Sequence, residues 1–189
     1  IGYEAAMDMN GASGLTIVGH NAGKALQTGS SNTLIGNRAG SAMTTGSNNT
    51  AVGSGALQTE DAGVDNVAIG VNALGLLDAG TGGGNVAIGS QACKFITTGV
   101  ENTIIGSYAG NSLVDGTRNV AVGYKAGTAI TSGEDNVTIG HDAGEALTTG
   151  DRNIAIGTDA LKAAQNSNNN VAIGHDAGLA YNSSSQLLA

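Results

Sequence analysis

Asn85-Val86-Ala87-Ile88-Gly89 is the stretch that decides the fold, because close copies of it recur along the chain. Each copy ends on a glycine, and these anchor glycines stand at positions 2, 19, 36, 53, 70, 89, 106, 123, 140, 157 and 174. The position numbers of successive anchors differ by 17, except for one difference of 19, where Gly83 and Gly84 are inserted. A fixed period of this size predicts a solenoid in which every repeat forms one layer.

The repeats leave no room for a second type of domain. Eleven such repeats and the two-residue insertion at 83–84 account for residues 1–189. The chain opens on Ile1 and closes on Leu187, Leu188 and Ala189, and neither end carries the polar cap that solenoids usually need in water. We therefore interpret it as a single repeat array and expect it to be a fragment of a longer fibre.

The residues around each anchor predict a β-strand. The residue before the anchor is always Ile or Val, and the residue two places earlier is Thr, Val or Ile, all branched at Cβ. We predict that each strand pairs in parallel with the strands of the neighbouring repeats and that the Ile or Val before the anchor is buried inside the solenoid. The residue between them points the other way and is never charged, so both faces of the strand require cover.

This second apolar face predicts contact between chains. A continuous apolar stripe is not normally left in water, and small side chains allow close approach. We expect a homotrimer whose interface includes the alanines at the middle of the strands. The candidates are Ala51, Ala68, Ala87, Ala121, Ala155 and Ala172. A second layer made by the chain's own Ala and Leu residues is the alternative cover.

The remainder of the repeat is less decisive. Ala stands three residues after every anchor, and apolar residues follow at the sixth and seventh positions, a spacing that fits a short strand or one helical turn. Gly at the tenth position indicates a turn that needs positive φ or close backbone approach. The Asn residues that head nine strands would stack as an amide ladder if layers lie about 4.8 Å apart. The expected fold is an all-β parallel β-solenoid, or β-roll, of eleven repeats.

Composition excludes several functional classes. The chain has 32 glycines but no Pro, which argues against collagen. Its 7 basic and 15 acidic residues give a net charge of −8, so nucleic acid is an improbable partner. No apolar run approaches the roughly 18 residues of a membrane span. Cys93 occupies a slot that elsewhere holds Leu or Gly, so we expect a buried small side chain rather than a reactive thiol.

Candidate chemistry is sparse, and we expect no catalytic residue, no cofactor and no metal. His20, His141 and His175 each follow an anchor, but they belong to distant repeats. Gly82-Gly83-Gly84 lacks a P-loop lysine and is interpreted as a loop insertion. Two groups of carboxylates could offer oxygens to Ca²⁺, although we favour solvated loop charges. They are Glu60, Asp61 and Asp65, and Glu134, Asp135 and Asp151.

The two variable positions after each anchor are the candidate receptor-contact row. Exposed Tyr, His, Asn and Asp side chains there could bind host-surface carbohydrate, although recognition elsewhere on a longer fibre is the simpler alternative. The candidates are His20, Asn21, Asn37, Arg38, Tyr108, Tyr124, Lys125, His141, Asp142, His175 and Asp176.

The repeat unit also resembles known fibre proteins. Asn-Val-Ala-Ile-Gly followed by two polar residues and Ala-Gly or Ala-Leu, closing with Thr-Thr-Gly-x-x-Asn, resembles the 17-residue repeats of bacteriophage tail fibres. It is similar as well to the shorter head repeats of trimeric autotransporter adhesins, which share a Val-Ala-Ile-Gly core. The resemblance implies a homotrimeric β-roll on a virion tail fibre or an extracellular cell surface.

The expected function is therefore a structural shaft or adhesion segment used in host attachment by a phage tail fibre. A bacterial adhesin head that binds surface glycans is the alternative. An ice-binding solenoid is a lesser one, because its Thr rows would be broken. The rows start at Thr44-Thr45, Thr97-Thr98 and Thr148-Thr149 and are interrupted by Asp61, Asp78, Val114 and Gln165.

Overall fold

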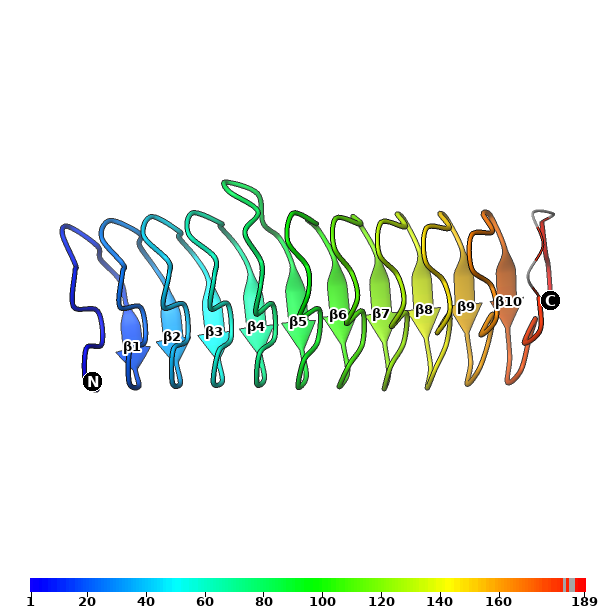
Figure 1. Cartoon of the computed structure of the whole chain (residues 1–189), viewed down its shortest axis with the longest axis horizontal. Helices are drawn as coiled ribbons and strands as arrows, with labels where there is room; N and C mark the ends of the chain where they lie inside the picture. The colour runs from blue at the N-terminus through cyan, green and yellow to red at the C-terminus, as the bar shows by residue number, and fades with distance from the viewer. Residues whose placement is uncertain (182, 184–185) are drawn as a thin grey trace.

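The computed structural model describes residues 1–181, 183 and 186–189 and places ten strands in one parallel sheet that follows the order of the chain. Figure 1 shows the strands side by side along the long axis, with each return loop lying over its own strand. The strands are β1 (Thr16–Val18), β2 (Thr33–Ile35), β3 (Thr50–Val52), β4 (Val67–Ile69), β5 (Val86–Ile88), β6 (Thr103–Ile105), β7 (Val120–Val122), β8 (Val137–Ile139), β9 (Ile154–Ile156) and β10 (Val171–Ile173).

The pairing register follows the repeat. Thr33 of β2 pairs with Thr50 of β3, one period further along the chain, whereas Val67 of β4 pairs with Val86 of β5 across the insertion. The loop between β4 and β5 absorbs the inserted residues and projects beyond its neighbours in Figure 1. The predicted all-β parallel β-solenoid is thus confirmed.

The predicted assignment of the inner and outer faces is wrong. The middle residues of β2 to β10 are buried inside the solenoid, whereas the residues on either side of them are half-buried or exposed. In β6, Ile104 is 1% exposed and Ile105 is 37% exposed. The six alanines expected at a trimer interface all lie in the chain's own core with no exposed surface. They are Ala51, Ala68, Ala87, Ala121, Ala155 and Ala172.

Packing across the core explains why the middle residue points inward. It faces the residue four places after the anchor, and in most layers one of the two is small where the other is large. Leu34 is opposite Gly40, where an added Cβ would lie 2.8 Å from the Leu34 side chain. Ala155 is instead combined with Leu161, and both are fully buried. Close packing requires this exchange of volume, because the interior has no space for two large side chains in one layer.

The segment after each anchor is a series of turns. Ala22 N–H donates to Gly19 O, and Leu26 N–H donates to Gly23 O, each closing a turn of four residues. Further bonds run between layers, as from Gly23 N–H to Ala39 O at 2.9 Å. Among the described residues there is no helix, so the helical turn left open by the sequence is excluded there. Alternating left-handed residues such as Asn21 (φ 57°) and Gly23 (φ 53°) prevent it.

The close approach of neighbouring layers explains why glycine and asparagine recur at fixed positions of the repeat. Gly106 has a φ of 137°, and a Cβ there would overlap the Gly123 carbonyl of the next layer. The predicted amide ladder is confirmed: Asn49 Nδ2 donates to Asn32 Oδ1 at 3.2 Å and to Gly63 O at 2.8 Å. Stacked amides therefore satisfy most of the ladder's polar groups inside the fold, where unpaired groups would be costly; Asn66 Nδ2, which has no acceptor among the described residues, is an exception.

Candidate functional site

The predicted receptor-contact row lies along one edge of the solenoid. The first residue after an anchor is exposed in nearly every layer, as His20, Asn37, Tyr124, His141 and His175 illustrate. The second residue has a left-handed backbone and donates its N–H to the preceding layer. Examples are Arg38 N–H to His20 O at 2.9 Å and Asp142 N–H to Tyr124 O at 3.1 Å. The backbone hydrogen bonds between layers therefore fix the position from which each of these side chains projects.

The row divides into two groups. Near the N-terminus, the Tyr3 ring stacks on His20 with the centroids 5.4 Å apart, and Asn37 Nδ2 lies 3.3 Å from His20 Nδ1. In the intervening layers the first position carries Ser54, Val71 and Ser90, with no aromatic ring. The structure therefore does not bring all the predicted residues into one continuous site.

The group nearer the C-terminus contains more aromatic rings and more polar contacts. Tyr108 and Tyr124 meet edge to face at 6.3 Å, and Tyr124 stacks on His141 at 5.3 Å. Gln91 Nε2 donates to the Tyr108 hydroxyl at 3.2 Å, and Lys125 Nζ lies 5.6 Å from the Tyr124 centroid. Three exposed rings flanked by amide and ammonium groups are typical of a surface that stacks against a sugar ring or a planar ligand.

Next to these rings lies a cluster of charges that spans two layers. Asp159 occupies the same slot as Asp142, one layer further on, and Lys162 Nζ lies 2.8 Å from Asp159 and 3.4 Å from Asp142. His141 Nδ1 is 3.2 Å from an Asp142 oxygen. The Lys162 ammonium lowers the pKa of the Asp159 carboxyl, and the hydrogen bond to Asp159 raises the pKa of Lys162.

The sequence predictions missed Asp159 and Lys162. The signal was present, because adding one repeat period to Asp142 leads to Asp159. Residues that are distant along the chain become direct neighbours between layers.

The carboxylates considered for Ca²⁺ do not converge. Glu60 points into the core at the seventh position, where other layers hold Leu26 or Leu77, and it is fully buried. Its carboxylate accepts N–H bonds from Ala62 and Gly63, and burial raises its pKa. Asp61 instead accepts from the Thr44 hydroxyl. The oxygens of this group are therefore engaged by the protein itself.

The second carboxylate group is neutralised in a similar way. Arg118 bonds Glu134 and Asp135, each at 2.7 Å, and lowers the pKa of Asp135. Asp151 Oδ1 accepts the Glu134 N–H at 2.9 Å.

Cys93 is fully buried as expected, and burial raises the pKa of its thiol.

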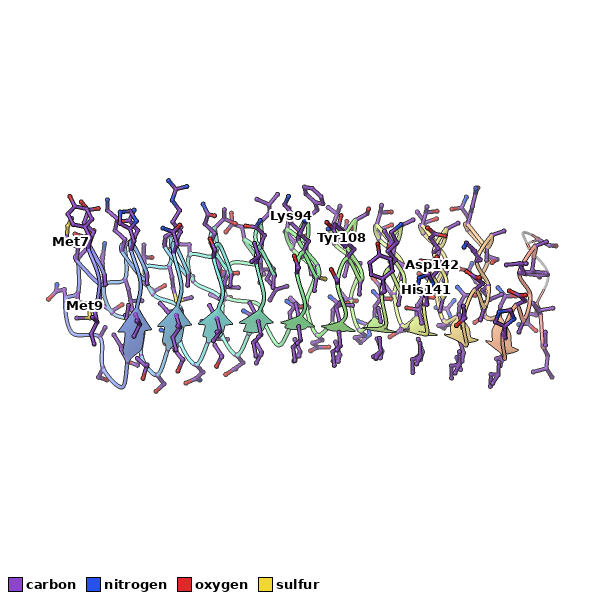
Figure 2. The ribbon with its side chains drawn as sticks, turned by 90° about the horizontal axis from the view of Figure 1, so that it is seen from below. Met7, Met9, Lys94, Tyr108, His141 and Asp142 are labelled. Atoms are coloured by element: carbon purple, nitrogen blue, oxygen red, sulfur yellow. The ribbon has the colours of Figure 1, made fainter. Side chains whose placement is uncertain are left out.

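The outer face of the sheet is an uncharged surface that runs along all ten strands. Its two rows consist of Thr, Val and Ile at the first and third positions of every strand and carry no charge. Figure 2 shows side chains projecting from the strands along one edge of the molecule. The most exposed apolar members are Val18 at 39%, Ile69 at 38%, Ile105 at 37%, Ile139 at 36% and Ile173 at 60%.

Threonine rows in the loops are only partly available to an external ligand. The hydroxyls of Thr97, Thr131 and Thr148 each donate to a carbonyl of the next layer, at 3.2 Å. Hydroxyls committed in this way do not present a regular lattice of free donors. This arrangement gives no support to ice binding.

No protein-family model, curated protein or solved structure matches this chain. The described residues also contain no helix long and apolar enough to cross a bilayer.

Proposed function

We propose that the chain is a structural shaft or adhesion segment of an extracellular homotrimeric fibre, most simply a phage tail fibre used in host attachment. The eleven repeats would set its length, and its role would not involve catalysis. The observation that carries the proposal is the uncharged outer face of the sheet. Parallel sheets normally have both faces covered, and here the chain's own loops cover only the inner one.

Copies of the same chain are the partner that suits this face. The face repeats its chemistry at every layer, so a second copy matches it along the full length of the sheet. Side chains branched at Cβ also lose little rotamer freedom when they pack. Three copies around a common axis would bury all three faces together, in keeping with the resemblance to tail-fibre repeats.

Light scattering on matched variants tests the proposal. Ile69→Glu with Ile105→Glu places charges on the outer face, and Val71→Glu with Val114→Glu places them on other surfaces of similar exposure. We expect the unchanged chain and the second variant to have the mass of a trimer, and the first variant to be a monomer. A monomeric unchanged chain at micromolar concentration would refute the trimer.

Glycan attachment is a second candidate, supported by the exposed rings of Tyr108, Tyr124 and His141. Binding of the chain to a panel of immobilised bacterial surface polysaccharides would test it. We expect Tyr124→Ala to lower binding at least several-fold, because it removes the central ring. Tyr3→Ala, which alters the separate N-terminal group, should leave binding unchanged. Equal binding by both variants would exclude this surface.

A further inference from the structure

The group formed by His141, Asp142 and Asp159 has the composition of a metal site. One potential ligand atom from each residue lies within 4.8 Å of the other two. His141 and Asp142 follow the anchor Gly140, and Asp159 comes from the next layer. Figure 2 shows His141 and Asp142 together on the same part of the molecule.

The backbone holds these ligands in place. Asp142 and Asp159 have left-handed φ values of 54° and 58°, so both side chains leave the chain in the same way. Asp159 N–H donates to His141 O at 3.0 Å, which locks the two layers together at this point. The His141 ring is held by stacking on Tyr124. A site fixed by a regular backbone loses little freedom when it binds an ion.

One carboxylate oxygen of Asp142 lacks a hydrogen-bond donor that a bound cation would replace. Asp142 is only 9% exposed; its Oδ2 lies 3.4 Å from Lys162 Nζ, whereas its Oδ1 is buried with no hydrogen-bond donor among the described residues. Buried carboxylate oxygens normally have a donor or a metal, because desolvation is otherwise costly. This observation is independent of the spacing of the three ligands.

The charges around Asp142 lead to the same conclusion. Lys162 Nζ lies within 3.4 Å of oxygens of Asp142, Glu145 and Asp159. One ammonium group thus faces three carboxylates, and the cluster remains negative. Lys162 is about one-third exposed, so solvent screens its ion pairs, and its Nζ also lies 3.4 Å from Glu145, a partner outside the three proposed ligands.

We propose that His141, Asp142 and Asp159 bind a divalent transition-metal ion of the zinc class. An imidazole nitrogen with two carboxylates suits Zn²⁺, Ni²⁺ or Co²⁺, whereas Ca²⁺ requires six or more oxygens and Mg²⁺ keeps most of its water. Three protein ligands would leave positions for water. The site does not depend on the proposed fibre function.

The chain contains a matched control for this site. His20, Asn21 and Arg38 occupy the same three slots near the N-terminus. They offer an imidazole but no carboxylate, and Arg38 brings a positive charge. Zinc should therefore bind at His141 and not at His20, although both side chains are exposed and both stack on a tyrosine.

Titration calorimetry with zinc chloride on the intact chain tests the proposal. We expect one Zn²⁺ per chain, with affinity lowered at least about tenfold by His141→Ala and by Asp159→Asn, and unchanged by His20→Ala. Lys162→Gln should raise the affinity, because it removes the competing cation. Excess Ca²⁺ or Mg²⁺ should not displace the zinc.

Two results would overturn the metal site. One is the absence of zinc binding by both the unchanged chain and Lys162→Gln. The other is binding that His20→Ala weakens as much as His141→Ala does, which would indicate unspecific capture by exposed imidazoles. Circular dichroism of each variant shows whether the fold is retained. Lys162→Gln, which alters no ligand, keeps the test valid if a ligand substitution disturbs the layer.

Discussion

The inner and outer sides of the ten-stranded sheet are built from similar residues but have different surroundings. On the inner side, Ile104 and Ala155 are almost fully buried against the chain's own turns. On the outer side, Ile105 and Ile139 remain more than one-third exposed although they are just as apolar. Hydrophobicity alone therefore does not reveal which side of the sheet is the core. The core side is recognised because a large side chain on the strand is opposite a small residue on the turn, and a small one is opposite a large one.

Aspartate on each side of one strand is the strongest test of this difference. Ile104→Asp buries a charge inside the solenoid and should lower the free energy of unfolding by about 4 kcal/mol or more. Ile105→Asp should cost less than about 1 kcal/mol in the isolated chain, because the charge stays in water. Urea unfolding followed by circular dichroism at low protein concentration measures both. The reverse order of stability would contradict the assignment of the faces.

Exchanging a small and a large side chain across one layer of the core tests the packing of the inner side. Ala155→Leu should cost about 1–3 kcal/mol, because the larger side chain meets Leu161 in the same layer. Adding Leu161→Gly should recover part of this loss and produce the combination found at Leu34 and Gly40. A double-mutant cycle by thermal unfolding measures the coupling. Additive losses would show that the two positions do not share space.

Glu60 gives the smallest expected effect, through its dependence on pH. Burial raises its pKa in the fold above the unfolded value, so its favourable contribution is complete below the unfolded pKa and is lost as pH rises through the folded pKa. Glu60→Gln should therefore become more stable relative to the unchanged chain between about pH 4 and pH 7. Unfolding across this range measures the difference, with Asp61→Asn as the exposed control. A constant difference would contradict the buried charge.

Much of the fold could be predicted from the sequence because the period fixes the register. Once Asn32, Asn49 and their equivalents are aligned, parallel pairing and the amide ladder follow. The faces could not be assigned from β-branching, because both sides of each strand are apolar. The pairs Leu34 with Gly40 and Ala155 with Leu161 contained the missing information.

The candidate site was predictable only in part. The row containing His141 and Asp142 was identified, but Asp159 and Lys162 were not, because their proximity depends on stacking between layers. Glu60 was interpreted as a solvated loop charge, although its slot holds Leu or Met in neighbouring repeats. Position within the repeat is a better guide to burial here than residue type.

Protection of single cysteines tests the central claim, that copies of the chain cover the outer face, most directly. Labelling of Ile105→Cys by a maleimide is compared with Ala121→Cys on the inner side and Val71→Cys on another exposed surface. The native Cys93 is buried and contributes little background. We predict that Ile105→Cys is protected when the chain is concentrated and reacts on dilution, that Ala121→Cys is always protected, and that Val71→Cys always reacts. Equal, concentration-independent labelling of Ile105→Cys and Val71→Cys would contradict the account.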